Sequence, residues 1–337
     1  MILEDLPLLR LRVDLTSLDT LEVPPYKGDL LRMALLWWLS EFWCPEERRC
    51  RDGCRRPDVC MFGRLCTPQV NPAWSEPLRR LMGDTPPPAY TLWDLRDRRT
   101  MFEAGDDWAF EMTWAGALAI QQLPALIAAL QRGAEQGMGR IRWRNQIRQI
   151  TAWVPTPESS WRAHPLAELG TLSGQPALIW QGPQLAELRF DYRQAASWAA
   201  IYSAPLRALQ LDYLSPVKMK ERGEWVVAPA FDAVARSVVR RLRILSEVYG
   251  GGEWPQSEYG PLLDLAETVT LQHHETHWLG YTRRSRRAGR YEVEGFAGPA
   301  WYAAEDFRPL LPVLWLGQWL HLGKGYVLGN GRYEIRE

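Results

Sequence analysis

Histidine is scarce in this chain of 337 residues: there are five, and the first 163 positions contain none. Charge of one sign is also missing, because forty Lys and Arg residues balance forty Asp and Glu residues. Such a chain has no overall positive field to hold a polyanion, so a nucleic-acid site has to come from local clusters. The N-terminus carries acids where a signal peptide needs basic residues, and no apolar run approaches membrane-spanning length. We therefore expect a cytoplasmic protein without a membrane partner.

Cysteine is absent outside one short stretch, about residues 44–66, which contains Cys44, Cys50, Cys54, Cys60 and Cys66. A reducing compartment disfavours structural disulfides, so the clustering favours a thiolate metal site, with zinc as the preferred ion. We assign Cys44, Cys50, Cys54 and Cys60 as its ligands. The spacings lack the C-x2-C knuckle of specific zinc motifs, and a loop of free thiols is the alternative.

In the first half of the chain, residues 1–154, segments with the apolar spacing of a strand alternate with segments that have the spacing of a helix. Leu9, Leu11, Val13 and Leu15 alternate with polar residues and predict a half-buried strand. Residues 29–42 keep helical spacing, strand-like material follows near residues 100–113, and a second helix is expected over about residues 124–135. A turn with Gly137 and Gly139 then leads toward another strand.

The same plan returns in residues 205–337, after a segment (residues 155–204) that we interpret as a linker or insertion. A strand over residues 209–213, a helix over residues 230–249, strands near residues 268–271 and 291–296, and a helix over about residues 306–322 are expected. Gly329 and Gly331 precede the last strand. This repetition predicts an α+β protein made of two tandem ferredoxin-like (βαββαβ, RRM-like) domains, with the cysteine stretch inserted in the first.

Glycine pairs close both halves. Glycine allows positive φ and close backbone approach, so such a loop can present backbone N–H groups to phosphate. A tight helix-to-strand turn that binds nothing is the structural alternative.

The C-terminal run from His321 to Tyr333, with Gly323, Lys324, Gly325, Gly329, Gly331 and Arg332, resembles the glycine-rich signature of the repeat-associated RNA-binding (RAMP) superfamily. It is most similar to the branch of CRISPR-associated endoribonucleases that mature guide RNA. Leu214-Ser-Pro-Val-Lys218, Trp278-x-x-Tyr281 and Tyr26-Lys-Gly28 also match. The resemblance implies tandem ferredoxin-like domains that bind a CRISPR repeat RNA, often as a hairpin, and cleave precursor guide RNA (crRNA) without metal. The products would carry a cyclic phosphate and a 5′-hydroxyl.

Such cleavage uses the RNA's own 2′-hydroxyl as nucleophile, so the protein orients it, moves protons and stabilises charge on the phosphate. The family's usual histidine near the first helix is missing here. Tyr26 and Lys27 stand at the matching helix entry, where Tyr26 can orient groups or donate a proton and Lys27 can stabilise the phosphate. A packed ring at the domain interface is the alternative for Tyr26. His321 is the candidate base, with Lys324 beside it, and a histidine that caps the helix is its alternative.

RNA binding is predicted from three arginine groups and the C-terminal glycines. Five arginines without an intervening acid, near Trp278 and Tyr281, suit phosphate contacts and base stacking: Arg283, Arg284, Arg286, Arg287 and Arg290. Arg236, Arg240 and Arg243 share the outer face of the second half's long helix and predict a basic ridge. Arg140, Arg142 and Arg144 alternate and predict an arginine-lined sheet face. Gly323, Gly325, Gly329 and Gly331 complete the predicted RNA-binding set.

Two functions of different kinds fit this pattern. In the first, the chain is a metal-independent endoribonuclease that matures crRNA and then leaves it or stays bound as part of an effector complex with other subunits. In the second, it is a non-catalytic crRNA-binding or structural subunit of such a complex, which the missing early histidine favours.

Overall fold

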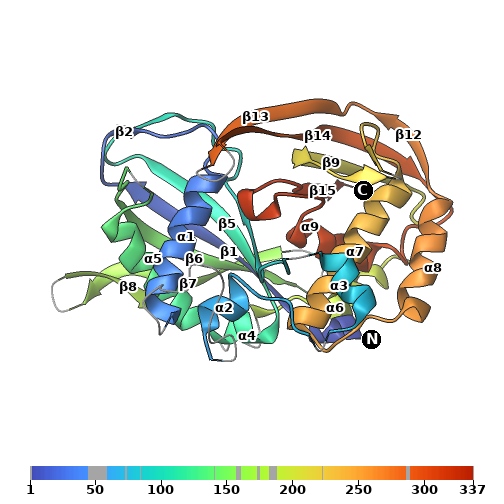
Figure 1. Cartoon of the computed structure of the whole chain (residues 1–337), viewed down its shortest axis with the longest axis horizontal. Helices are drawn as coiled ribbons and strands as arrows, with labels where there is room; N and C mark the ends of the chain where they lie inside the picture. The colour runs from blue at the N-terminus through green and yellow to red at the C-terminus, as the bar shows by residue number, and fades with distance from the viewer. Residues whose placement is uncertain are drawn as a thin grey trace.

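The computed structural model shows two α+β domains side by side, each an antiparallel sheet with helices packed on one face (Figure 1). The structure describes residues 2–44, 59–72, 74–83, 85–139, 141–156, 161–172, 175–181, 188–221, 223–285 and 289–336. Two apolar cores account for most of the buried side chains: one lies within the first domain, and the other fills the second domain and continues into the junction with the first. The predicted α+β class with two domains is confirmed.

The first domain follows the order strand, helix, strand, strand, helix, strand. Its main elements are β1 (Leu8–Ser17), α1 (Gly28–Trp43), β3 (Tyr90–Trp93), β5 (Asp107–Ala115), α5 (Leu123–Gln136) and β6 (Asn145–Pro155). Two further strands, β7 (Trp161–Leu172) and β8 (Gln175–Trp180), extend the sheet, whose order is β3-β5-β1-β6-β7-β8. Part of the segment interpreted as a linker therefore belongs to this sheet.

The alternation in β1 determines which face of the sheet is covered. Leu9, Leu11 and Val13 are buried in the first core, beneath α1 and α5, whereas Arg10 and Arg12 point to the opposite face. Helix α1 buries Leu31, Leu35 and Trp38 on the stripe expected from helical spacing.

Short elements surround this framework. They are η1 (Ile2–Asp5), β2 (Leu21–Glu22), α2 (Met61–Leu65), α3 (Glu76–Met82), β4 (Met101–Phe102) and α4 (Ala117–Gln121). Helix α3 leaves the first domain and packs against the second (Figure 1).

The second domain repeats the order. It contains β9 (Ala208–Val217), α7 (Phe231–Tyr249), α8 (Gln256–Glu267), β12 (Thr270–His274), β14 (Gly289–Ala303), α9 (Leu311–Leu320), η3 (Tyr326–Leu328) and β15 (Tyr333–Arg336). The sheet order is β12-β14-β9-β15, and β13 (His277–Ser285) pairs with the overhanging part of β14. A small hairpin, β10 (Lys220–Glu221) with β11 (Glu224–Trp225), precedes α7.

The two domains share a continuous interface. Helix α6 (Tyr192–Ala199) packs on α9, and Trp319 of α9 lies against Trp161 and Phe190. Above this apolar junction the β13–β14 hairpin reaches over the first domain, and the segment between α9 and β15 lies between the domains (Figure 1). The geometry places that C-terminal segment where both domains can contribute to one site.

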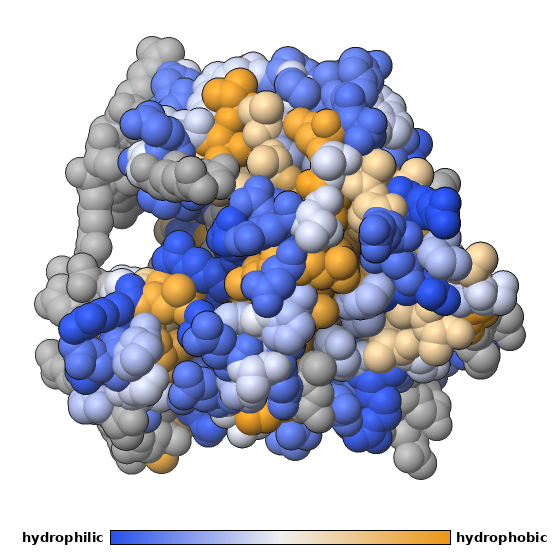
Figure 2. Space-filling view, turned by 90° about the vertical axis from the view of Figure 1, so that its right-hand side faces the viewer, coloured by the Kyte–Doolittle hydropathy of each residue, from blue (hydrophilic) through white to orange (hydrophobic). Residues whose placement is uncertain are grey.

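Hydrophobic residues are scattered over the outer face of the second domain. Figure 2 shows them in small groups among hydrophilic residues on the side that faces right in Figure 1. Among the described residues, no helix is both long enough and apolar enough to cross a membrane.

Candidate nucleic-acid interface

Two sequence motifs, residues 214–218 and residues 321–333, fold against each other. The backbone N–H of Lys324 donates to the carbonyl oxygen of Lys218 at 3.0 Å, and that of Gly331 donates to Pro216 at 3.0 Å. Gly323 has φ of 61°, and a Cβ there would lie 2.5 Å from the Lys218 oxygen, so only glycine permits this approach. The close contact brings Lys218 and Lys324 next to each other.

The C-terminal glycines adopt the left-handed conformations expected from the sequence. Gly323, Gly325, Gly329 and Gly331 have φ values of 61°, 81°, 89° and 77°. Their segment folds mostly on itself, however: the N–H groups of Leu322, Lys324 and residues 328–332 all donate within the protein. The prediction that this loop mainly offers backbone N–H groups to phosphate is therefore corrected, and the exposed ammonium of Lys324 is its more available feature.

His321 lies at the C-terminal end of α9 and is buried, with only 3% of its surface exposed. Its Nδ1 lies 3.1 Å from the carbonyl oxygen of Asn330, to which it donates. Burial, together with the charge of Arg332, holds the pKa of His321 well below the ordinary value. Because the imidazole is enclosed and bonded to Asn330 beyond the helix, its placement disfavours the predicted role as catalytic base.

Lys27 is also enclosed, within the first domain. Its Nζ donates to the carbonyl oxygens of Asp97 at 2.7 Å and Arg99 at 2.9 Å, and its side chain has no exposed surface. Burial lowers the pKa of Lys27. The predicted phosphate contact does not fit this placement, because the ammonium is used to hold residues 97–99 against the start of α1.

The start of α1 meets the glycine-rich segment across the domain boundary. A Cβ at Gly28 would lie 1.9 Å from the carbonyl oxygen of Leu328, so the two backbones touch. One residue before Lys27, the half-buried Tyr26 stacks on Tyr281 of β13, with ring centroids 3.8 Å apart and planes 11° apart. The Arg98 guanidinium lies 4.3 Å from the Tyr26 ring centroid.

Tyr281 links this stack to the glycine-rich segment, since its hydroxyl donates to Oδ1 of Asn330 at 3.3 Å. Tyr26, Arg98, Tyr281 and the glycine-rich segment therefore form one group, built from both domains. Arg98 was not expected from the sequence, because nothing in its neighbourhood distinguishes it from other surface arginines.

A second group lies on the second domain, around the indole of Trp225. The Nζ atoms of Lys218, Lys220 and Lys324 lie over this ring, 4.5, 4.6 and 5.8 Å from its centroid. Lys218 also bonds Glu294 at 2.8 Å, and this contact lowers the pKa of Glu294. We call Lys218, Lys220, Lys324 and Trp225 the Trp225 cluster.

The side chains of Trp278 and Tyr281 do not form one site, although the two residues are close in the sequence. Three residues apart on a strand, they point to opposite sides. The indole of Trp278 donates to Glu294 at 3.2 Å, on the side of the Trp225 cluster, whereas Tyr281 meets Tyr26.

The predicted arginine groups are placed differently from expectation. Strand β6 begins at Asn145, Arg142 lies in a turn with φ of 51°, and Arg144 is paired with Asp19 at 2.6 Å, so no arginine-lined strand face forms there. Arg140, Arg286 and Arg287 lie outside the described residues. Arg283, Arg284 and Arg290 belong to the paired strands of the β13–β14 hairpin.

The predicted ridge on α7 is largely engaged within the protein. Arg236 pairs with Asp232 and Glu267, Arg240 donates to the carbonyl oxygen of Leu81, and Arg243 lies over the Tyr259 ring. On the same helix, Arg241 was missed: it donates to the Gly323 carbonyl at 2.8 Å and lies 3.5 Å from the Tyr326 ring centroid. It fastens the glycine-rich segment to α7.

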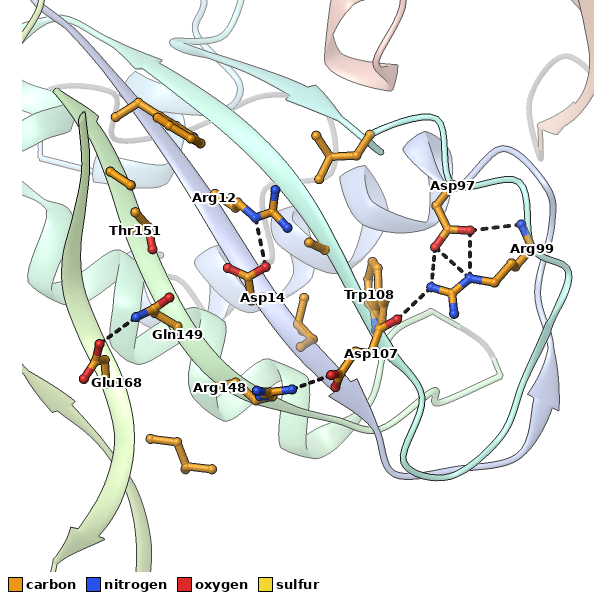
Figure 3. Close-up of a pocket in the computed structure, with 16 residues that line it drawn as sticks. Arg12, Asp14, Asp97, Arg99, Asp107, Trp108, Arg148, Gln149, Thr151 and Glu168 are labelled. Carbon is orange, nitrogen blue, oxygen red and sulfur yellow. Dashed lines mark hydrogen bonds and ion pairs between the residues drawn. The ribbon is translucent and has the colours of Figure 1, made fainter. Parts of the chain in front are cut away.

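The face of the first sheet opposite α1 and α5 carries an open pocket of about 940 Å³ (Figure 3). Each arginine along it faces a carboxylate: Arg12 bonds Asp14, Arg99 bonds Asp97, and Arg148 bonds Asp107. Glu168 adds a further negative charge and bonds Gln149 at 2.6 Å. With its cations neutralised, this face does not suit a polyanion.

The cysteines within the described residues do not form a metal site. No group of three or more His, Cys, Asp or Glu residues suited to a metal occurs in the described ranges. The thiol of Cys60 accepts the N–H of Gly63 at the start of α2, and burial raises the pKa of Cys66. Cys44 is half-buried, and Cys50 and Cys54 lie outside the described residues. The zinc prediction is not supported.

Comparisons with known proteins agree with this architecture. Residues 211–333 match the family model described as CRISPR-associated endoribonuclease Cas6, and residues 6–171 match a model described as an N-terminal domain. A sequence search among curated proteins gave no significant match.

Solved structures show the same fold at low identity. The product complex of Thermus thermophilus Cas6 is similar over 98% of this chain and 100% of that chain, with 14% identity and a TM-score of 0.56. A partial Cas6-RT-Cas1–Cas2 complex is similar over 100% of this chain but only 47% of that chain, again with 14% identity and a TM-score of 0.56. Residues 211–333, which contain the glycine-rich motif, therefore match the Cas6 family of CRISPR-associated endoribonucleases, and the whole chain shares the fold of Cas6 structures.

Proposed function

We propose that this chain binds a CRISPR repeat RNA and cleaves precursor crRNA by attack of the RNA's 2′-hydroxyl on the adjacent phosphate, without metal. The observation that carries the proposal is the group around Tyr26. Its phenol lies between the Arg98 guanidinium and the Tyr281 ring, at the junction of α1 and the glycine-rich segment. A phosphate beside Tyr26 would meet a hydroxyl together with the Arg98 guanidinium, which also pairs with Asp94 at 2.8 Å.

In this proposal Tyr26 orients the scissile phosphate or donates its proton to the leaving 5′-oxygen, and the 2′-hydroxyl proton passes to solvent. Arg98 stabilises the charge that develops on the phosphate. Lys324, exposed on the glycine-rich segment, supplies a further cation. His321 and Lys27 are left out of the reacting group because both are buried.

RNA binding in this proposal rests on the second domain. The Trp225 cluster includes the separate β10–β11 hairpin that follows β9, whereas Arg283, Arg284 and Arg290 lie in the β13–β14 hairpin of the domain's main sheet. In both domains the sheet order and the succession of strands and helices support a tandem ferredoxin-like architecture, in which the first domain extends through β8 and the second begins near residue 205.

The test is incubation of the purified protein with its repeat RNA in EDTA. We expect one cut, with a cyclic phosphate and a 5′-hydroxyl at the new ends. A 2′-deoxynucleotide on the 5′ side of the cut should abolish it without weakening binding. Cleavage that needs a divalent ion, or that tolerates the deoxynucleotide, would contradict the proposed chemistry.

The second candidate function is a crRNA-binding subunit that does not cut. It is favoured by the burial of His321, which leaves the glycine-rich segment without an accessible imidazole. Tight binding of intact repeat RNA in the same assay would select it. Retention of the product in an effector complex is a further part of the proposal, tested by co-purification of mature crRNA with the protein.

A further inference from the structure

The Trp225 cluster is not explained by folding alone. Trp225 is a large apolar side chain that remains 38% exposed, on a hairpin of two short strands. Lys220 pairs directly with Trp225 across this hairpin, so both side chains project from the same face. If Trp225 served only to stabilise the fold, its indole would be buried, whereas it is partly exposed and surrounded by lysine ammonium groups.

Like charges are brought together in this cluster by the backbone. The hydrogen bond from Lys324 N–H to the Lys218 oxygen, and the glycine that allows it, hold two lysines beside each other. Glu294 binds Lys218 at 2.8 Å, and among the side chains that the structure describes no carboxylate is paired with Lys220 or Lys324. Such an arrangement costs electrostatic free energy in the free protein and is relieved by an anion.

A nucleotide combines the two chemistries that the cluster offers. Its phosphate suits the lysines, and its base has a flat face that stacks on indole. Inside a duplex both faces of a base are already covered by neighbouring pairs, so only an unpaired nucleotide can use the ring.

We propose that the Trp225 cluster is a subsite for one unpaired nucleotide of the RNA, with its base stacked on Trp225 and its phosphate held by Lys218, Lys220 and Lys324. The inference rests on the proposed RNA function and deepens it, because it assigns single-stranded RNA to this part of the second domain. The paired part of a repeat lies elsewhere.

Two probes test the subsite directly: a twelve-nucleotide oligoadenylate, and the same strand paired with oligouridylate. Trp225→Ala is expected to weaken binding of the single strand about 5- to 100-fold, the effect of one lost base stack. Binding of the duplex should be unchanged, and Trp225→Phe should retain most of the affinity. Trp180→Ala is the matched control, because Trp180 is 41% exposed but lies on β8 of the first domain.

The lysines are tested through salt dependence. Lys220→Gln should reduce the slope of log Kd against log salt for the single strand by about 0.7, the value for one phosphate contact. Oligoadenylate affinity that is equal in Trp225→Ala and Trp180→Ala, or an unchanged slope in Lys220→Gln, would overturn the subsite.

Cleavage of repeat RNA in EDTA, measured on the same preparations, separates the two proposals. Cleavage by the wild type without any effect of Trp225→Ala on oligoadenylate binding would reject the subsite alone. Oligoadenylate binding that depends on Trp225, without cleavage of repeat RNA, would reject the catalytic function and keep the subsite. Circular dichroism is the control that tests whether each variant is folded.

Discussion

The ring of Tyr26 stacks on the ring of Tyr281, with centroids 3.8 Å apart and planes 11° apart. Tyr26 precedes the first helix of one domain, and Tyr281 lies on the long hairpin of the other. The stack therefore couples the position of the hairpin to the start of α1. An RNA that binds along the hairpin would be presented to Tyr26 by the same contact.

Replacing the Tyr26 hydroxyl tests its role in proton movement. Tyr26→Phe keeps the ring, so the stack and the fold should remain, and RNA affinity should change less than about threefold. If the hydroxyl orients the phosphate or protonates the leaving oxygen, the single-turnover cleavage rate should fall about 10²- to 10⁴-fold. The Tyr281→Phe variant is the control, since it keeps the stacked ring and removes the hydroxyl that donates to Asn330. Wild-type cleavage by Tyr26→Phe would remove Tyr26 from the chemistry.

Burial of His321 predicts a pH dependence of stability. Its pKa is depressed in the folded state, so the unfolded chain binds a proton that the folded chain does not as pH falls below about 6.5. The free energy of unfolding should then decrease by up to about 1.4 kcal/mol per pH unit between pH 6.5 and the folded-state pKa.

Urea denaturation from pH 8 to pH 5 measures this effect. His321→Asn should flatten the curve below pH 6.5, whereas His273→Asn should leave it unchanged because His273 is 63% exposed. A His321→Asn curve parallel to that of the wild type would show that His321 titrates normally and is accessible, which would restore it as a candidate base.

The helices and strands with strong apolar periodicity were predictable from the sequence. Helices α1, α5 and α7 lie within two residues of their expected bounds, because each buries one continuous stripe against a sheet. The start of the strand after Gly139, which was expected to carry Arg140, Arg142 and Arg144, was not predictable. Positive φ at Gly137, Gly139 and Arg142 extends the turn, so the strand begins only at Asn145.

The sequence motifs that form the candidate site were predictable, but the contacts and directions of their side chains were not. The motifs around Lys218 and Lys324 were both identified, yet their contact depends on backbone hydrogen bonds between distant parts of the chain. Nothing in the sequence next to Lys27 indicates that its ammonium turns inward to the carbonyls of residues 97 and 99. Trp225 was overlooked because two-residue strands have no measurable period.

The contact between Gly28 and Leu328 predicts a large effect from a small substitution. Gly28→Ala places a methyl group against a backbone oxygen that a Cβ would approach to 1.9 Å, so either α1 or the glycine-rich segment has to move. We expect a loss of about 2 kcal/mol in unfolding free energy, together with weaker RNA cleavage. Gly260→Ala is the control: a Cβ there would meet only Gln256 at 3.8 Å, and since the gain in helix propensity is opposed by crowding against Pro261, stability should change by less than about 1 kcal/mol.

The enclosure of Lys27 predicts that this residue matters for folding and not for phosphate binding. Lys27→Met removes the donor to two carbonyl oxygens and one of the two cations beside Asp97, and we expect a loss of about 3 kcal/mol in unfolding free energy. Lys324→Met, at an exposed position, should change stability by less than about 0.5 kcal/mol but weaken RNA binding and reduce its salt dependence. Urea denaturation and RNA titration at a temperature where both variants are folded distinguish the roles. If Lys27→Met instead kept wild-type stability and lost cleavage, the ammonium would have to leave its carbonyl partners and reach the RNA during the reaction.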